Sequence, residues 1–410
     1  MYNMLNNIDY NKNRQIITKS AAAELHAMFK EYYTNEEDLV KYFTDAFPNK
    51  RLLTLENIKK LLSYHIYNKH PNSNIDNSEY ENIDEILDII KQRLGSLDRW
   101  SFETGSLWGK APHFVPSNGS EAGGQWAFKM PIGLIQPDIQ ISDKDIVICN
   151  HFPTNKLTII HKPFIFYALM FWIRIVVNYY IYRLGFTNII DPATQLRVWI
   201  KHQPAATNKV PLVFIHGLGF GIVLYLWKIR SLSADRTLIL PELPNISYDL
   251  YTDVKPSADN IVVALYDVLI RQGVELVDLI GHSYGGTILN IFQIKYPHMC
   301  NYKTYIESPV FCIHQSHSAK IAYMKPMSLS VRKYIIYLFI FSDTYVQYII
   351  KRSMFADQGM IKNFDDKTTV ILAEDDYLVP SYYIHRYITA HYPQVNAIMT
   401  AGDHGAYIFG

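Results

Sequence analysis

Cysteine is scarce in this sequence: Cys149, Cys300 and Cys312 are the only three among 410 residues, and none belongs to a CxxC pair. This excludes a fold built on disulfides and a zinc site built on cysteines. It suits an intracellular, reducing compartment. Residues 1–15 contain no apolar core, so we expect no Sec-type export signal.

An excess of charge of one sign is also lacking. The 39 Lys and Arg residues balance 38 Asp and Glu residues, for a formal net charge of +1. Because nucleic-acid binding needs a clustered basic surface, we expect no nucleic-acid partner. Charged residues make up 19% of the chain and hydrophobic residues 49%, which excludes disorder of the whole chain. With 410 residues, the chain exceeds one ordinary hydrophobic core and predicts a full-size domain plus an appended region.

Residues 1–160 carry apolar positions at helical spacing in short segments, but no motif that indicates chemistry. We predict a mainly helical N-terminal region of unknown function there. Short strands are predicted over residues 145–150 and 157–161. The pair His314 and His317 has no acidic residue at metal-ligand spacing, and we predict no metal site.

A hydrophobic helix is predicted over residues 161–186, and its most apolar part is residues 164–182. This part is just long enough to span a bilayer, but Arg174 near its middle makes insertion marginal. Tyr167, Arg174 and Asn178 share one face of such a helix, which makes it amphipathic. Three alternatives stay open: a helix lying on a membrane, a spanning helix and a buried packing helix.

From about residue 187, apolar runs of strand length alternate with longer helical patterns, which is typical of a parallel α/β sheet. A helix is predicted over residues 257–271, with Ser257 as its N-cap. We predict an α/β fold over residues 187–410, a mostly parallel sheet flanked by helices. Its strands are expected over residues 210–215, 237–240, 275–280, 302–306, 368–373 and 395–399.

One predicted strand runs directly into a G-x-S-x-G motif, formed by Gly281, His282, Ser283, Tyr284 and Gly285, and a helical pattern follows. Glycines on both sides let the serine occupy a tight turn with strained backbone geometry. The turn holds the hydroxyl clear of the sheet, and the helix after it points N–H groups at developing negative charge. The motif therefore predicts Ser283 as a nucleophile.

A glycine-rich turn follows the first predicted strand in the order His216, Gly217, Leu218, Gly219. Acyl transfer needs two donors for the oxyanion, one from the residue after the nucleophile and one from such a loop. The glycines let backbone N–H groups turn inward. The candidate oxyanion donors are the N–H groups of Leu218 and Tyr284.

Acidic and imidazole side chains follow two later strands. Asp375 and Asp376 come after the fifth predicted strand, and either carboxylate could orient an imidazolium. His404 lies between small residues just past the last strand. The chain order is Ser283, acid, His404, and each member falls where open α/β sheets bind their ligands.

The segments FIHGLG, GHSYGG, EDDYLVP and GDHG resemble the α/β-hydrolase superfamily. The resemblance implies that Ser283 is the nucleophile, His404 the general base and Tyr284 an oxyanion donor. In that family the acid precedes an x-Leu/Ile-Val-Pro ending, which favours Asp376 over Asp375. The resemblance implies a serine hydrolase, esterase- or lipase-like, that needs no cofactor and no metal.

Members of that superfamily commonly carry a cap, and residues 309–366 fit such an insertion. Its apolar part is broken at Ser342 and Asp343, which favours a helix hairpin over an apolar pocket. We expect a hydrophobic acyl ester as substrate, from a small molecule or a lipid, and a membrane contact through residues 164–182. The alternative is a non-catalytic binding or scaffold protein. Only six residues follow His404, so the closing helix is expected to be short or absent.

Overall fold

The computed structural model describes residues 157–203, 208–246, 256–312, 331–354, 356–359 and 363–409, together with short segments before residue 157. These segments are residues 22–23, 25–27, 30, 52–54, 62–63, 66–67, 81–89, 113–116 and 126–129. Strands β1 (Leu52–Thr54), β2 (His113–Pro116) and β3 (Trp126–Lys129) form a small antiparallel sheet in the order β1-β3-β2. The predicted mainly helical region and the strand over 145–150 fall largely outside the described residues.

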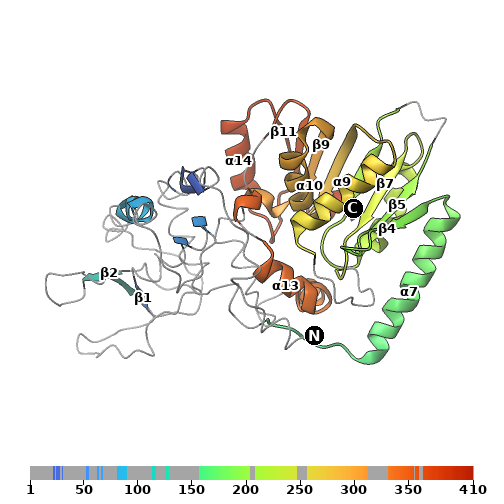
Figure 1. Cartoon of the computed structure of the whole chain (residues 1–410). Coiled ribbons are helices and arrows are strands. Elements are labelled where there is room, and N and C mark those ends of the chain that lie inside the picture. Colours follow the sequence, from blue (N-terminus) through green and yellow to red (C-terminus); the bar gives the residue numbers. More distant parts are fainter. Residues whose placement is uncertain are drawn as a thin grey trace.

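An eight-stranded sheet forms the centre of the molecule, in the order β11-β10-β9-β8-β6-β7-β5-β4 (Figure 1). Strands β6 to β11 pair with one another in parallel, whereas β5 is antiparallel to both β4 and β7. The strands are β4 (Thr187–Ile190), β5 (Arg197–Lys201), β6 (Leu212–Ile215), β7 (Leu238–Glu242), β8 (Val277–His282), β9 (Cys300–Ile306), β10 (Thr368–Ala373) and β11 (Asn396–Thr400).

The predicted mostly parallel α/β sheet is confirmed, and all six expected strands are present with shifts of a few residues at their ends. Strands β4 and β5 were not predicted, because β4 is short and largely exposed and shows no apolar alternation. The strand expected over residues 157–161 is wrong. That segment joins no ladder, and its Ile160 N–H donates to the Ser342 carbonyl instead.

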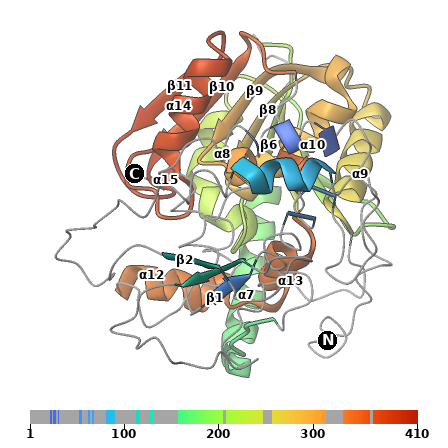
Figure 2. The ribbon, with the colours of Figure 1, turned by 90° about the vertical axis from the view of Figure 1, so that its left-hand side faces the viewer.

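Helices cover both faces of the sheet (Figures 1 and 2). Val213 and Ile215 of β6 face the core shared with α9, α10 and α14, while Leu212 and Phe214 face the core shared with α7, α8 and α15. This alternation follows from the two-residue period of a strand. The helices are α7 (Phe164–Arg183), α8 (Leu226–Leu232), α9 (Ala258–Arg271), α10 (Tyr284–Lys295), α14 (Ser381–His391) and α15 (Ala406–Phe409).

The N-cap of α9 and the short helix after His404 agree with the predictions from the sequence. The Ser257 hydroxyl caps α9 by accepting the Asn260 N–H at 3.1 Å. The closing helix α15 has only four residues, but its Ile408 is buried in the core shared with α7 and α8. This short helix therefore still covers part of the sheet.

The apolar run forms α7, a helix long and apolar enough by composition to cross a membrane. Met170, Arg174, Val177 and Ile181 are buried on its packed side, whereas most of the helix is exposed. Arg174 ion-pairs with Glu242 of β7 at 2.8 Å, with both side chains less than a tenth exposed. The alternative of a fully buried packing helix is therefore wrong, and Arg174 anchors α7 to the sheet.

Within the predicted cap, the described residues form η4 (Pro309–Cys312), α12 (Val331–Ile336), the π-helical turn η6 (Tyr337–Phe341), α13 (Thr344–Arg352) and η7 (Ala356–Gly359). Asp343 ends the apolar run by accepting the N–H groups of Tyr345 and Val346, which starts α13. Ile340 packs so close to Gly219 that a Cβ added there would lie 3.0 Å from it. This part of the chain thus contacts the loop after β6, while its role as a cap stays a prediction.

Candidate active site

Ser283 occupies the turn between β8 and α10 in strained backbone geometry, with φ 52° and ψ −124°. A positive φ is uncommon for a residue with a side chain and persists only where the surroundings enforce it. The Ser283 N–H donates to the Ile306 carbonyl of β9 at 2.9 Å, which continues the sheet pairing into the turn. The turn therefore presents the serine hydroxyl at the carboxyl end of the sheet.

Close packing around this turn explains the two glycines of the motif. A Cβ on Gly281 would lie 2.6 Å from the Gly285 carbonyl oxygen, a distance that real Cβ atoms do not show. A Cβ on Gly285 would collide with the carbonyls of Ile215 and His216 at the end of β6. The absence of side chains at both positions lets α10 start directly against β6.

His404 and Asp376 lie beside Ser283 at the same sheet edge. The Ser283 hydroxyl and His404 Nε2 are 3.1 Å apart, and His404 Nδ1 lies 2.7 Å from Asp376 Oδ2. Asp376 Oδ1 also accepts the N–H groups of Leu378 and Val379, which fixes the carboxylate. The exposed Asp375 makes no such contact among the described residues; its N–H pairs with the Gly402 carbonyl.

The charges around His404 favour its protonated form. Burial acts to lower the pKa of His404, but the charge of Asp376, the hydrogen bond to it and the charge of Glu307 act in the opposite direction. Together they raise the pKa above the ordinary value of 6.5. With Nδ1–H donating to Asp376, the lone pair on Nε2 faces the Ser283 hydroxyl.

The loop after β6 lies against the serine, since a Cβ on Gly217 would approach the Ser283 Cβ to 3.0 Å. Leu218 follows Gly217 in this loop, and Tyr284 directly follows Ser283 at the start of α10. The two candidate oxyanion donors thus belong to the two segments that meet at the serine. His216 is fully buried and accepts the Leu243 N–H on Nε2 at 3.0 Å. Burial lowers the pKa of His216 to about 4, so the ring is neutral and acts as a structural link.

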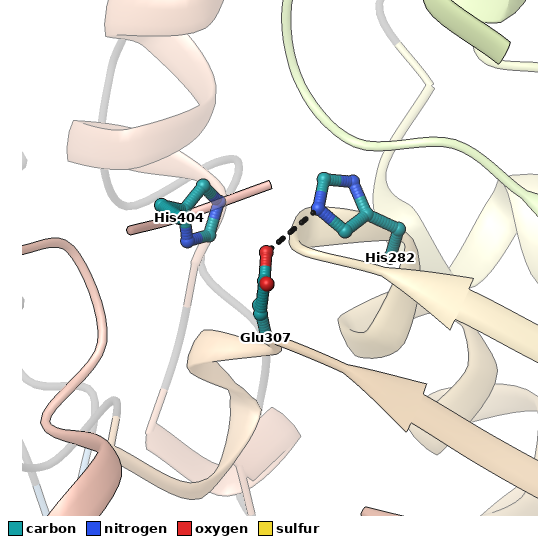
Figure 3. A group of neighbouring side chains, drawn as sticks. All are labelled: His282, Glu307 and His404. Atoms are coloured by element: carbon teal, nitrogen blue, oxygen red, sulfur yellow. Dashed lines mark hydrogen bonds and ion pairs between the residues drawn. The ribbon is translucent and has the colours of Figure 1, made fainter. Parts of the chain in front are cut away.

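A buried hydrogen-bond network, absent from the sequence analysis, joins three parts of the site. The Gly217 N–H donates to the Tyr225 hydroxyl at 3.1 Å, and this hydroxyl lies 2.7 Å from His282 Nδ1. His282 Nε2 lies 3.3 Å from Glu307 Oε2 (Figure 3). Glu307 in turn accepts the N–H groups of Gly405 and Tyr407, which follow His404.

The direction of these hydrogen bonds follows from the protonation of each group. Burial raises the pKa of Tyr225 well above its usual range, so its hydroxyl keeps its proton and donates to His282 Nδ1. Burial lowers the pKa of His282, although the hydrogen bond to Glu307 acts against this. A neutral His282 then donates from Nε2 to Glu307, which ties the β8 turn to the His404 loop.

Only part of this network had a signal in the sequence. Glu307 directly follows β9, the position where polar residues of an open α/β sheet gather, and His282 lies inside the G-x-S-x-G motif. Tyr225 ends the 3-10 helix η2 (Gly221–Tyr225) in a run of apolar residues, so nothing distinguished it from a core residue.

His282, Glu307 and His404 also offer ligand atoms that lie within 4.8 Å of one another, as a metal site would (Figure 3). Both nitrogens of His282 already hydrogen-bond Tyr225 and Glu307, and both nitrogens of His404 contact Ser283 and Asp376. A cation would have to displace these contacts. The cluster therefore fits a hydrogen-bond network better than a metal site.

Known proteins resemble this chain over a limited part. The human (lyso)-N-acylphosphatidylethanolamine lipase is 31% identical over 108 residues, which are 25% of this chain and 32% of the relative. The pig 1-acylglycerol-3-phosphate O-acyltransferase ABHD5 is 25% identical over 116 residues, which are 27% of this chain and 33% of the relative. The chain thus matches about a third of the length of these curated relatives.

Among solved structures, carboxylesterase CesB from Bacillus subtilis is similar with a TM-score of 0.39 and 14% identity, over 58% of this chain and 92% of that one. No family model matches the chain. The strand order, the antiparallel β5 and the serine turn between β8 and α10 define the α/β-hydrolase fold. The similarity to the curated relatives supports a place in the α/β-hydrolase superfamily.

The buried network predicts a stability effect. Tyr225→Phe would leave the Gly217 N–H and His282 Nδ1 without their hydroxyl partner, and each such buried group costs about 1–3 kcal/mol. With two such groups, we expect the free energy of unfolding to fall by roughly 2–6 kcal/mol in chemical denaturation. Tyr266→Phe is the matched control, since that ring stacks on Tyr296 and its hydroxyl makes no hydrogen bond among the described residues. Equal effects of the two substitutions would contradict the role of Tyr225.

Proposed function

We propose that this protein is a serine hydrolase that cleaves an ester of a hydrophobic acyl group through an acyl-enzyme. The observation that carries the proposal is the hydrogen-bonded series from the Ser283 hydroxyl through His404 to Asp376. Similarity to the α/β-hydrolase superfamily supports the reaction class. The proposed domain division assigns this activity to residues 187–410, with residues 309–366 as a cap.

In the first half-reaction, His404 Nε2 takes the Ser283 proton while the oxygen attacks the ester carbonyl. The Leu218 and Tyr284 N–H groups hold the resulting oxyanion, and Asp376 stabilises the imidazolium. His404 then gives its proton to the leaving alcohol. In the second half-reaction, His404 deprotonates a water that attacks the acyl-enzyme, and the acid leaves as Ser283 regains its proton.

The chemical class of the substrate is proposed from two kinds of support. The relatives named above are a lipase and an acyltransferase of lipid substrates by their names. The apolar side chains of α7 and α12 in this chain also favour a hydrophobic acyl group over a charged substrate. A small-molecule or lipid ester as partner, a membrane contact through residues 164–182 and an intracellular location complete the proposal.

Labelling with a fluorophosphonate probe tests the nucleophile. The wild-type chain should label, and Ser283→Ala should not, because the probe reacts covalently with an activated serine. Ser231→Ala, at an exposed position of α8, is the control and should label like the wild type. A folded wild-type protein that does not label would instead support the non-catalytic alternative.

Hydrolysis of p-nitrophenyl esters of increasing acyl length tests the substrate class. We expect kcat/KM to rise from acetate to octanoate, because each buried CH2 contributes about 0.8 kcal/mol, close to fourfold per carbon at full burial. Ser283→Ala provides the background rate. A maximum at acetate would rule out a hydrophobic acyl site while leaving the serine mechanism intact.

The pH profile tests the charges around His404. Only neutral His404 can accept the serine proton, so kcat/KM should fall as the pH drops through its raised pKa, above 6.5. Glu307→Gln removes a negative charge that raises this pKa, and the half-maximal point should move to lower pH. Glu275→Gln, at an exposed position, should leave the profile unchanged. An unshifted Glu307→Gln profile would show that the Glu307 charge does not act on His404.

A further inference from the structure

Helix α7 presents a long apolar face to solvent. Trp172 and Val176 near its middle are 64% and 62% exposed, and Phe164 at its start is 85% exposed. A soluble monomer rarely leaves a contiguous apolar patch of this kind uncovered. The exposed large side chains of α7 are Phe164, Ile165, Leu169, Phe171, Trp172, Ile175, Val176, Tyr179, Tyr180 and Tyr182.

The contacts on the packed side of α7 favour a helix that lies along a surface over one that spans a bilayer. Arg174 is held by Glu242 of β7, and Val177 and Ile181 are buried in the core of the sheet. A helix that crossed a bilayer would have to leave this core and break a buried ion pair, which is strongly unfavourable because it leaves a buried charge without its partner. The helix as folded can instead lie along a surface, with its apolar side outward.

The start of α7 contacts the part of the chain that is predicted as a cap. The ring of Phe166 stacks on Phe339 of η6 with centroids 5.2 Å apart. Lys162, just before α7, donates to the Ser342 hydroxyl at 2.7 Å. Figures 1 and 2 both place the start of α7 at the same end of the molecule as the helices of the predicted cap.

Helix α12 adds exposed apolar side chains to this end, with Val331 79% and Ile335 49% exposed. The neighbouring η6 packs through Ile340 against the loop that carries Gly219 and borders Ser283. One continuous stretch of chain therefore links the exposed apolar surface to the candidate oxyanion loop. We call the outward sides of α7 and α12 the apolar end.

The residue types on α7 distinguish a lipid from a protein occupant. From Phe164 to Val177 the only charged side chain is the buried Arg174, so this part offers almost none of the polar rim typical of protein interfaces. Tyr179, Tyr180 and Tyr182 gather instead at the C-terminal end of the helix, beside the exposed Arg183. Such rings favour the headgroup level of a bilayer.

We propose that the apolar end docks on a lipid surface, with α7 lying in one leaflet rather than spanning the bilayer. Burial of apolar side chains drives this docking, since the described part of α7 exposes one basic residue, Arg183. Docking turns the predicted cap, whose Ile340 packs against the candidate oxyanion loop, toward the membrane, so that the acyl substrate enters from the leaflet. Docking specifies the membrane contact of the proposed function, and only this last step rests on the proposed hydrolase activity.

Flotation of the full chain with phosphatidylcholine vesicles tests the proposal. The wild type should float with the vesicles to the same extent at low and high salt, because apolar contacts are not screened. The double substitution Trp172→Glu with Val176→Glu should lower the vesicle-bound fraction at least tenfold. The matched control places Glu at Val263 and Ile270, exposed apolar positions of α9, and should float like the wild type.

Each other occupant of the face gives a different result that overturns docking. A wild type that stays in the buffer as a dimer, and becomes a monomer in the Trp172 and Val176 variant, indicates a second copy of the chain. A monomer that does not float, with the fluorescence lost on Trp172→Phe shielded from acrylamide in the wild type, indicates that the face is covered within the protein. Resistance to alkaline carbonate extraction indicates a spanning helix.

Activity separates docking from catalysis. Ser283→Ala should float like the wild type, so failure of fluorophosphonate labelling would leave the docking result standing. In an active protein, the Trp172 and Val176 variant should lower the ratio of activity on a vesicle-embedded ester to activity on a soluble ester at least tenfold. An unchanged ratio would show that docking does not deliver the substrate.

Discussion

The buried carboxylate of Glu307 is the group through which the separate parts of the active-site edge are held together. Glu307 directly follows β9 and has a φ of 45°. Its carboxylate accepts hydrogen bonds from His282 Nε2 in the β8 turn and from N–H groups of the loop that carries His404. Through His282 and Tyr225, the same network reaches the Gly217 N–H beside Ser283. The relative positions of nucleophile, base and oxyanion loop therefore depend on one buried acceptor, because each of these loops would otherwise bury an unpaired polar group.

Much of this arrangement could be predicted from the sequence, because its signals are local. Strand-length apolar runs identified β6 to β11, and the G-x-S-x-G motif identified the Ser283 turn, since glycine is required where α10 meets β6. Tyr225 and the Arg174–Glu242 pair carried no local signal. Their partners lie 57 and 68 residues away in sequence, and only the folded sheet brings them together.

Arg174 shows why composition alone does not predict the placement of α7. In the sequence it marks a polar face of an apolar helix, which leaves surface, spanning and buried helices all open. In the fold its charge is compensated by Glu242, so the polar group lies on the packed side and the apolar side chains face outward. An ordinary surface helix of a soluble domain packs its apolar face and exposes its polar face, and α7 shows the reverse arrangement at Arg174.

The two carboxylates near His404 act on it differently. Asp376 accepts the His404 Nδ1–H directly and sets the orientation of the ring, whereas Glu307 acts through its charge and through the backbone after His404. An imidazolium formed during acyl transfer would be stabilised by both, in surroundings where burial strengthens each interaction. The same charges raise the pKa of His404 in the resting enzyme. A stronger stabilisation of the imidazolium therefore narrows the pH range over which His404 is neutral and can accept a proton. The buried hydrogen bonds of Glu307 from His282, Gly405 and Tyr407 keep its charge partly compensated, which limits this effect.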